Sequence, residues 1–211
     1  PHIPETMPAH DITFSAVWKI NEYTVTWIVD GEVIKTEPLD YGAAVVAPDY
    51  EVAEGYTFGG WDPAVGTMNS VDGLTFNAVW VADSDTKYTV ETYTMNTAGV
   101  YEMTSEVKGA ATDSVVNVKP ATVAEGFILN DELSVYEGTV TADNGLVLKV
   151  YIDRETYLFN TSTSENVTEK VGYLYGATVV VPAEEIKTGY TFDGWYYEGT
   201  KYAAGSAFTM P

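Results

Sequence analysis

The 211-residue sequence contains no cysteine and no glutamine. Without cysteine, the chain can form no disulfide, no thiolate metal site and no cysteine nucleophile. Without glutamine, it can form neither an internal thioester nor a Thr–Gln ester. A Lys–Asn isopeptide through Lys87 or Lys149 stays open on composition, although no sequence signature indicates one. Of these crosslinks, only the isopeptide is compatible with the composition.

Histidine is nearly absent, since His2 and His10 are the only two. A serine triad or a histidine metal site would have to be built around them, and the neighbouring residues show neither pattern. The acidic pairs Glu184-Glu185 and Asp131-Glu132 have the residue types of glycosidases, but the side chains of adjacent residues point apart. We therefore predict no catalytic residue and no cofactor, and we do not expect an enzyme.

Basic residues are few, with 10 Lys and Arg against 31 Asp and Glu and a net charge of −21. This charge repels phosphate backbones and anionic lipid heads, so we expect neither nucleic acid nor a membrane surface as a partner. Solubility is the simpler interpretation of the acidity. The alternative is loosely bound cations at Asp83-Ser84-Asp85, which lacks the glycine and the distant glutamate of an EF-hand loop. No metal site is predicted.

Long apolar runs are missing as well. None approaches the roughly 20 residues that span a bilayer, so no membrane insertion is expected within this sequence. No signal-peptide pattern opens it either. Because the first residues already belong to a repeat, we expect a fragment of a longer protein.

The sequence is rich in internal repeats. Gly55-Tyr-Thr-Phe-Gly-Gly-Trp61 returns as Gly189-Tyr-Thr-Phe-Asp-Gly-Trp195, and a weaker copy lies at Gly126-Phe-Ile-Leu-Asn-Asp131. Three opening segments precede these copies, starting at Tyr23, Tyr88 and Tyr157. A period near 65 residues indicates small modules with modest cores, which gain stability from their neighbours. The predicted domains are residues 1–20 as the end of a truncated repeat, then a first repeat (21–81), a second repeat (82–154) and a third repeat (155–211).

Alternating apolar residues and turn signals predict short strands. Asp30-Gly31 is a hairpin signal, and Ile12 to Trp18 alternates like Leu74 to Trp80. A helical turn is predicted only in residues 49–54 and 182–187. The fold class is therefore mainly β or α+β, in tandem small modules with at most one short helix each.

The two ends of the chain complement each other. Thr209-Met210-Pro211 repeats Thr6-Met7-Pro8, so the third repeat stops where a strand like residues 9–18 should follow. A missing strand leaves unpaired backbone groups and an open apolar groove. We therefore expect that residues 9–18 of one molecule can complete the third repeat of the next, head to tail.

Aromatic residues are abundant, with 16 Tyr, 7 Phe and 5 Trp. Rings that recur at equivalent repeat positions are predicted to be core; these are Tyr56, Phe58, Trp61, Tyr190, Phe192, Trp195, Trp18 and Trp80. The alternative is that exposed rings stack on sugar faces. Tyr196 and Tyr197, near Gly199, are the best candidates for such a ligand-binding site.

The ordered combination of Tyr-Thr-Val-Thr-Trp, Gly-Tyr-Thr-Phe-x-Gly-Trp and Phe-x-Ala-Val-Trp resembles the Listeria–Bacteroides repeat, also called the internalin B-repeat. The second repeat is similar to the mucin-binding-protein type of repeat. The resemblance implies β-grasp-like (ubiquitin-like) modules of a secreted or wall-anchored bacterial surface protein, without catalytic residues. The expected function is an extended stalk or spacer. The alternative is an adhesin module that binds a host glycan or surface protein through exposed Tyr and Trp.

Overall fold

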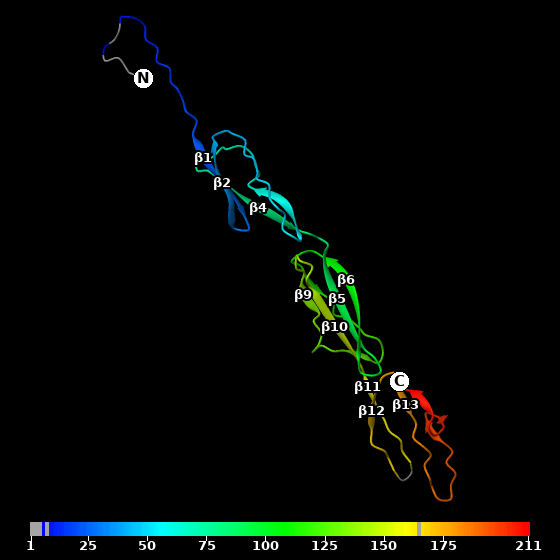
Figure 1. Cartoon of the computed structure of the whole chain (residues 1–211). Helices are drawn as coiled ribbons and strands as arrows, with labels where there is room; N and C mark the ends of the chain where they lie inside the picture. The colour runs from blue at the N-terminus through cyan, green and yellow to red at the C-terminus, as the bar shows by residue number, and fades with distance from the viewer. Residues whose placement is uncertain (1–5, 7–8, 164–165) are drawn as a thin grey trace. The chain divides into compact units, whose positions relative to one another are not determined.

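A computed structural model describes residues 6, 9–163 and 166–211 (Figure 1). The chain divides into two compact units, Pro1–Ala53 with Thr57–Val81 and Glu54–Tyr56 with Ala82–Pro211. Within the described residues the regular elements are all strands, so the prediction of a mainly β chain is confirmed. No helix in the described part of the chain is long and apolar enough to cross a bilayer.

The first repeat forms a four-stranded sheet in the order β2-β1-β4-β3. Its strands are β1 (Glu22–Val29), β2 (Glu32–Asp40), β3 (Tyr56–Asp62) and β4 (Leu74–Ala82). The predicted hairpin turn joins β1 to β2, and Asp30 and Gly31 both have positive φ, 51° and 82°. Strand β4 then pairs parallel to β1 on its other edge.

The core of the first repeat lies on one face of this sheet. Burial alternates along β1, as expected for a strand with one covered face. The buried side chains are Val25, Trp27, Val45, Met68 and Phe76. The Trp27 ring stacks on Phe76 with centroids 4.6 Å apart and meets Trp61 edge-on at 4.7 Å.

The second repeat repeats this topology in the order β6-β5-β10-β8. Its strands are β5 (Thr86–Met95), β6 (Tyr101–Ala110), β8 (Phe127–Leu129) and β10 (Val147–Arg154), with a separate pair of β7 (Val115–Asn117) and β9 (Glu137–Thr139). In the parallel central pair, Val25 lies opposite Leu74 in the first repeat and Val90 lies opposite Leu148 in the second.

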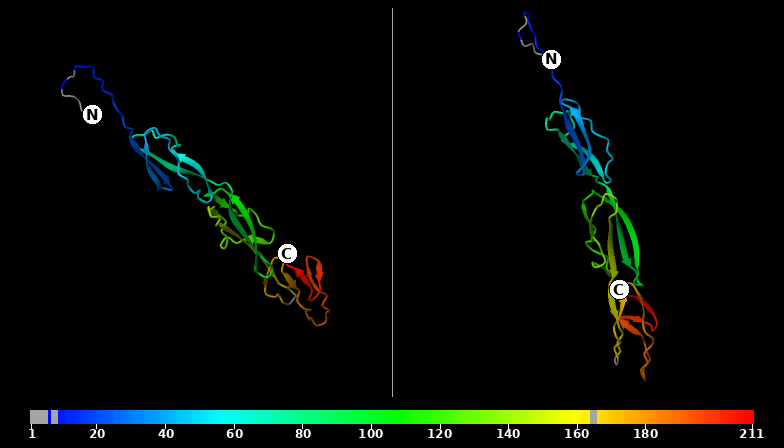
Figure 2. Two further views of the ribbon diagram at one scale, coloured as in Figure 1. Left: turned by 45° about the horizontal axis from the view of Figure 1, so that its top comes forward. Right: turned by 60° about the vertical axis from the view of Figure 1, so that its left-hand side comes forward.

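The third repeat contains three separate strand pairs. They are β11 (Thr156–Phe159) with β12 (Val171–Leu174), β13 (Thr178–Val180) with β16 (Ala207–Thr209), and β14 (Trp195–Tyr197) with β15 (Thr200–Tyr202). Figure 2 shows β13 and β16, drawn in orange and red, close to the β11–β12 hairpin. Its buried side chains include Val179, Val181 and Met210.

Two sequence predictions of local structure are wrong. Residues 12–18 form no strand, and the Trp18 ring, predicted to be core, is 90% exposed. A strand needs a partner for its backbone groups, and the described residues place none beside this segment. The predicted helical turns are also absent: residues 49–54 and 182–187 are irregular or turn, and Ile186 is 97% exposed, so no apolar contact supports a helix there.

The second and third repeats, which belong to one compact unit, meet at Arg154, the only arginine of the chain. Its Nε donates to the Met95 carbonyl at 2.9 Å, and one terminal guanidinium nitrogen donates to the Tyr175 carbonyl at 2.8 Å. The guanidinium also lies 4.7 Å from the centroid of the Phe127 ring. One half-buried side chain thus binds backbone on both sides of the boundary.

Backbone contacts reinforce this junction. Glu155, the single residue between β10 and β11, donates its N–H to the Gly126 carbonyl and accepts from the Tyr175 N–H. Gly126 has φ 76°, and a Cβ there would lie 2.1 Å from Cγ of Tyr175. Only glycine fits a positive φ against that ring.

The Tyr93 hydroxyl is expected to lose its proton at a pH far above that of an ordinary phenol. Its hydroxyl donates to Glu91 at 2.8 Å, and this bond, with partial desolvation, raises the pKa of Tyr93 from 10.0 to about 12. Because the folded-state pKa lies above the unfolded value, its contribution to stability is present below about pH 10 and is lost as pH rises toward 12.

The measurement is an ultraviolet phenolate titration of the native chain against Glu91→Gln, with Tyr93→Phe to assign the transition. Glu91→Gln should move one tyrosine back toward pH 10. Identical titration curves for the native chain and Glu91→Gln would contradict the assignment.

Candidate binding groove in the third repeat

An open groove of about 1330 Å³ lies in the third repeat. Its lining includes β11, residues 160–163, β14 and residues 208–211. The Phe208 ring contacts Phe159 at 5.6 Å and Tyr202 at 5.7 Å between centroids. Aromatic side chains therefore form a large part of the groove lining, and its volume exceeds the roughly 300–1,000 Å³ of most ligand sites.

The predicted core rings of the repeat anchor recur in equivalent contacts. Phe58 meets Trp61 at 5.5 Å and 70°, and Phe192 meets Trp195 at 5.5 Å and 65°. Trp195 is half-buried in the groove wall, and its Nε1 donates to the Pro182 carbonyl at 3.2 Å. The same pair geometry thus appears at both positions where the motif is complete.

The other predicted core rings are placed less uniformly. Tyr56 and Trp80 are half-buried, and the Trp80 Nε1 donates to Asp30 at 2.9 Å. Phe58 is 36% exposed, although it contacts both Trp61 and Trp80.

Tyr190, predicted to be core, is 74% exposed, and the Lys187 ammonium lies 5.1 Å from its ring centroid. The prediction is wrong here because residues 189–194 form no strand, whereas the matching Tyr56 begins β3 in a complete sheet.

Tyr196 and Tyr197, predicted from sequence as exposed candidates, both contribute to the groove lining and are 60% and 62% exposed. The Tyr196 hydroxyl donates to Asp193, which also accepts from the Lys201 ammonium at 2.7 Å. Lys201, and then Tyr196, lower the pKa of Asp193, while the bond to Asp193 raises the pKa of Tyr196. These contacts hold the Tyr196 ring in place at the groove.

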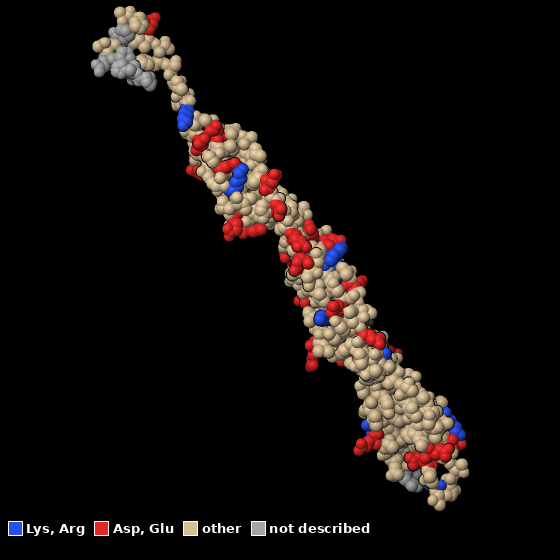
Figure 3. All heavy atoms as spheres, in the orientation of Figure 1, with Lys and Arg blue, Asp and Glu red and all other residues tan. Residues whose placement is uncertain are grey.

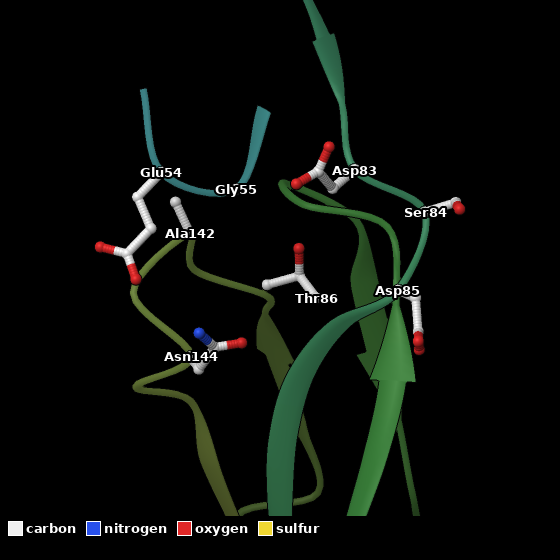
Figure 4. A pocket seen from close by; sticks show the side chains of 8 residues that line it. All are labelled: Glu54, Gly55, Asp83, Ser84, Asp85, Thr86, Ala142 and Asn144. Atoms are coloured by element: carbon white, nitrogen blue, oxygen red, sulfur yellow. The ribbon is translucent and has the colours of Figure 1, made fainter. Parts of the chain in front are cut away.

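A second, smaller cavity of about 390 Å³ lies beside the predicted acidic cluster (Figure 4). The figure shows the Asp83 and Asp85 carboxylates pointing in different directions, and Asp85 pairs with the Lys87 ammonium at 2.6 Å. Thr112 Oγ1 donates to the Gly55 carbonyl at 2.6 Å nearby. Within the described ranges no group of three or more metal-ligating side chains gathers here or elsewhere.

Acidic side chains are spread over the visible face in Figure 3 and do not form one patch. Lys and Arg are sparse between them. The distribution agrees with the scattered acids in the sequence and marks no binding surface by charge.

Comparison with known proteins gives a family match. A model of the Listeria-Bacteroides repeat domain matches residues 23–72 and 156–211, half of the chain. Internalin H of Listeria monocytogenes is 40% identical over 57 residues, which are 27% of this chain and 10% of internalin H.

Two further relatives come from Evansella cellulosilytica. One, whose name describes it as a membrane protein, is 27% identical over 202 residues, which cover 89% of this chain and 30% of that protein. The other, named as a glycine-rich membrane protein, is 26% identical over 213 residues, which cover 91% and 24%. The chain thus spans less than a third of the length of these relatives.

Among solved structures, Mub-RV aligns with 64% of this chain and 98% of its own, with 16% identity and a TM-score of 0.21. A TM-score this low carries no argument about the fold. The similarity of the second repeat to mucin-binding repeats therefore stays a prediction from its sequence.

Proposed function

Because the chain belongs to the Listeria-Bacteroides repeat family, we propose that it is a non-catalytic repeat region of a secreted or wall-anchored bacterial surface protein and serves there as a spacer. The proposed repeats are residues 21–81, 82–154 and 155–211, and residues 1–20 are the end of a further repeat. The two ranges that match the family begin close to the first residues of the first and third of these repeats. Each repeat is proposed to be a β-grasp-like module.

The observation that carries the spacer proposal is the junction at Arg154. A spacer holds its ends apart only if adjacent repeats do not fold back on each other, and relative motion is the default for small interfaces. Here one residue connects the two repeats, and Arg154 binds the Met95 and Tyr175 carbonyls on either side. Such a connection restricts the movement of one repeat against the other.

The spacer proposal is tested on a bacterial surface with an epitope tag placed beyond the repeats. Deletion of residues 82–154 should reduce capture of the cells by antibody-coated beads, and an unrelated spacer of the same length should restore capture. Capture that survives the deletion, or that only the native repeat restores, would refute a purely geometric role.

An adhesin that binds a host glycan or protein is the second candidate, and the exposed rings of Tyr196 and Tyr197 at the groove favour it. On a glycan and mucin array, the double variant Tyr196→Ala/Tyr197→Ala should abolish saturable binding by this chain. Tyr190→Ala, which removes a more exposed ring outside the groove lining, is the control and should bind like the native chain. If the native chain binds nothing on the array, only the spacer proposal remains. The remaining predicted partner, a second copy of the chain, would occupy the same groove.

A further inference from the structure

One turn of the anchor motif belongs to a different compact unit from the chain around it. Glu54–Tyr56 group with Ala82–Pro211 in the second unit, whereas the chain on either side of this turn groups with the first. The turn opens the first complete copy of the motif, and its glycine, Gly55, has φ 75°. By sequence the turn is part of the first repeat, and by its surroundings it is part of the structure around the second.

The second repeat binds the carbonyl of this glycine. The Gly55 carbonyl accepts from the Asp83 N–H at 3.0 Å and from Thr112 Oγ1 at 2.6 Å, and the Thr112 N–H donates to the Asp83 carbonyl at 2.9 Å. Thr112 is 3% exposed, and its hydroxyl oxygen lies 2.6 Å from that of Thr86. Because a carbonyl can only accept, the one hydroxyl proton of Thr112 goes to Gly55, and Thr86 donates to Thr112. A buried chain of two hydroxyls thus ends on the glycine carbonyl.

The shape of the second repeat also fits this turn closely. A Cβ added to Gly55 would lie 2.7 Å from both Cα and Cβ of Ala142 (Figure 4), so neither the positive φ nor the space admits another residue. The next residue, Tyr56, donates its hydroxyl to the Asp113 carboxylate. Asp113 itself has φ 63°, an uncommon conformation outside glycine. The second repeat therefore holds both the glycine of the turn and the hydroxyl that follows it.

The third repeat holds the weaker copy of the motif by the same backbone bonds. Gly126 has φ 76°, its carbonyl accepts from the Glu155 N–H at 2.9 Å, and the Tyr175 N–H donates to the Glu155 carbonyl at 2.8 Å. The residue after the glycine differs, because Phe127 has no hydroxyl and its ring instead meets the Tyr175 ring at 6.0 Å between centroids. A tyrosine thus faces a carboxylate in one case, and a phenylalanine faces a ring in the other.

We propose that the glycine–aromatic turn of the anchor motif is a docking element for the repeat that follows it, and that its aromatic residue selects this neighbour. In the second repeat the docking surface is Asp83, Thr112 and Asp113. A phenylalanine turn would leave the Asp113 carboxylate without the tyrosine hydroxyl, and a tyrosine turn facing a ring would lose its acceptor, so each mismatch is penalised. The inference goes beyond the spacer role, because neighbour recognition of this kind would serve an adhesin equally.

Hydrogen exchange of the full chain tests the docking of the glycine. Gly55→Ala should speed exchange of the Asp83 and Thr112 amides about tenfold, because the turn can no longer fit. Gly31→Ala is the matched control, since Gly31 has φ 82° and no atom within 4 Å of an added Cβ, and it should leave both amides unchanged. Thr112→Val, which leaves the sequence of the first repeat intact, should also speed exchange at Asp83. Equal exchange in the two alanine variants, or an unchanged Asp83 amide in Thr112→Val, would overturn the proposal.

A double-mutant cycle tests the recognition pair. Tyr56→Phe and Asp113→Gly each remove one partner of the bond, and glycine keeps the positive φ at residue 113. Each single variant should lower the protection of the Thr112 amide about tenfold, and the double variant should lower it about tenfold as well, because one bond is lost only once. Tyr41→Phe, whose ring meets Tyr23 at 6.1 Å, replaces Tyr56→Phe in a control cycle and should show no coupling to Asp113→Gly. A loss of about 100-fold in the double variant, the product of the two single effects, would show that the pair does not recognise each other.

Discussion

Phe76→Ala is expected to destabilise the first repeat by about 4 kcal/mol, because removing a buried phenylalanine loses both transfer free energy and packing. The ring is 1% exposed and stacks on Trp27 at the centre of the core. A module of about 60 residues buries only about 60% of its unfolded surface and is marginal to begin with. The variant is therefore expected to have a largely unfolded first repeat at room temperature.

Urea unfolding followed by tryptophan fluorescence measures this effect. Trp27, Trp61 and Trp80 report on the first repeat, and the second repeat contains no tryptophan. Val79→Ala is the control on the same strand, since Val79 is 42% exposed and its truncation should cost less than about 1 kcal/mol. If the two variants unfold at the same urea concentration, the Trp27–Phe76 contact is not the centre of the core.

The hairpin signal in the sequence predicted one turn correctly. The Asp30-Gly31 turn forms as expected because both residues accept positive φ, which is a property of the residues themselves. The parallel pairing of β1 with β4 was not predictable in this way, since it joins segments about 50 residues apart. Alternation shows which face of a strand is apolar and leaves open which strand will cover it.

Residues 12–18 show that limit most clearly. They carry nearly the same pattern as β4, yet β4 is a strand and they are not. The difference lies in the partner, because β propensity mostly reflects packing against neighbouring strands. Trp18 and Tyr190 were assigned to the core by repeat position, and each is exposed where its neighbouring strand is absent from the described residues.

The candidate groove was predicted in part. Tyr196 and Tyr197 stood out as adjacent aromatic residues near a glycine, and both lie at the groove. Phe159 and Phe208 were missed because they come together from distant parts of the third repeat. Arg154 was also missed, although one signal for it was present: it is the only arginine in the chain and stands at a repeat boundary.

Arg154→Met is expected to weaken the coupling between the second and third repeats by about 3 kcal/mol. Methionine keeps much of the apolar stem but removes two charge-assisted hydrogen bonds, worth about 1.5–3 kcal/mol each when made to a charged group, and the contact with Phe127. The expected result is that two transitions replace one coupled transition for these repeats, because the carbonyls of Met95 and Tyr175 lose the donor that they share.

Hydrogen exchange of the full chain locates this effect. The Glu155 amide, which donates across the boundary to the Gly126 carbonyl, and the neighbouring Tyr175 amide, which donates to the Glu155 carbonyl, should exchange roughly 100-fold faster in Arg154→Met, the factor that about 3 kcal/mol implies. Lys149→Met, on the same strand, removes a partly exposed charge 3.8 Å from Glu91 and should leave these amides unchanged. If both variants exchange alike, Arg154 does not hold the junction, and the spacer proposal loses the contact that distinguishes a stiff connection from a flexible one.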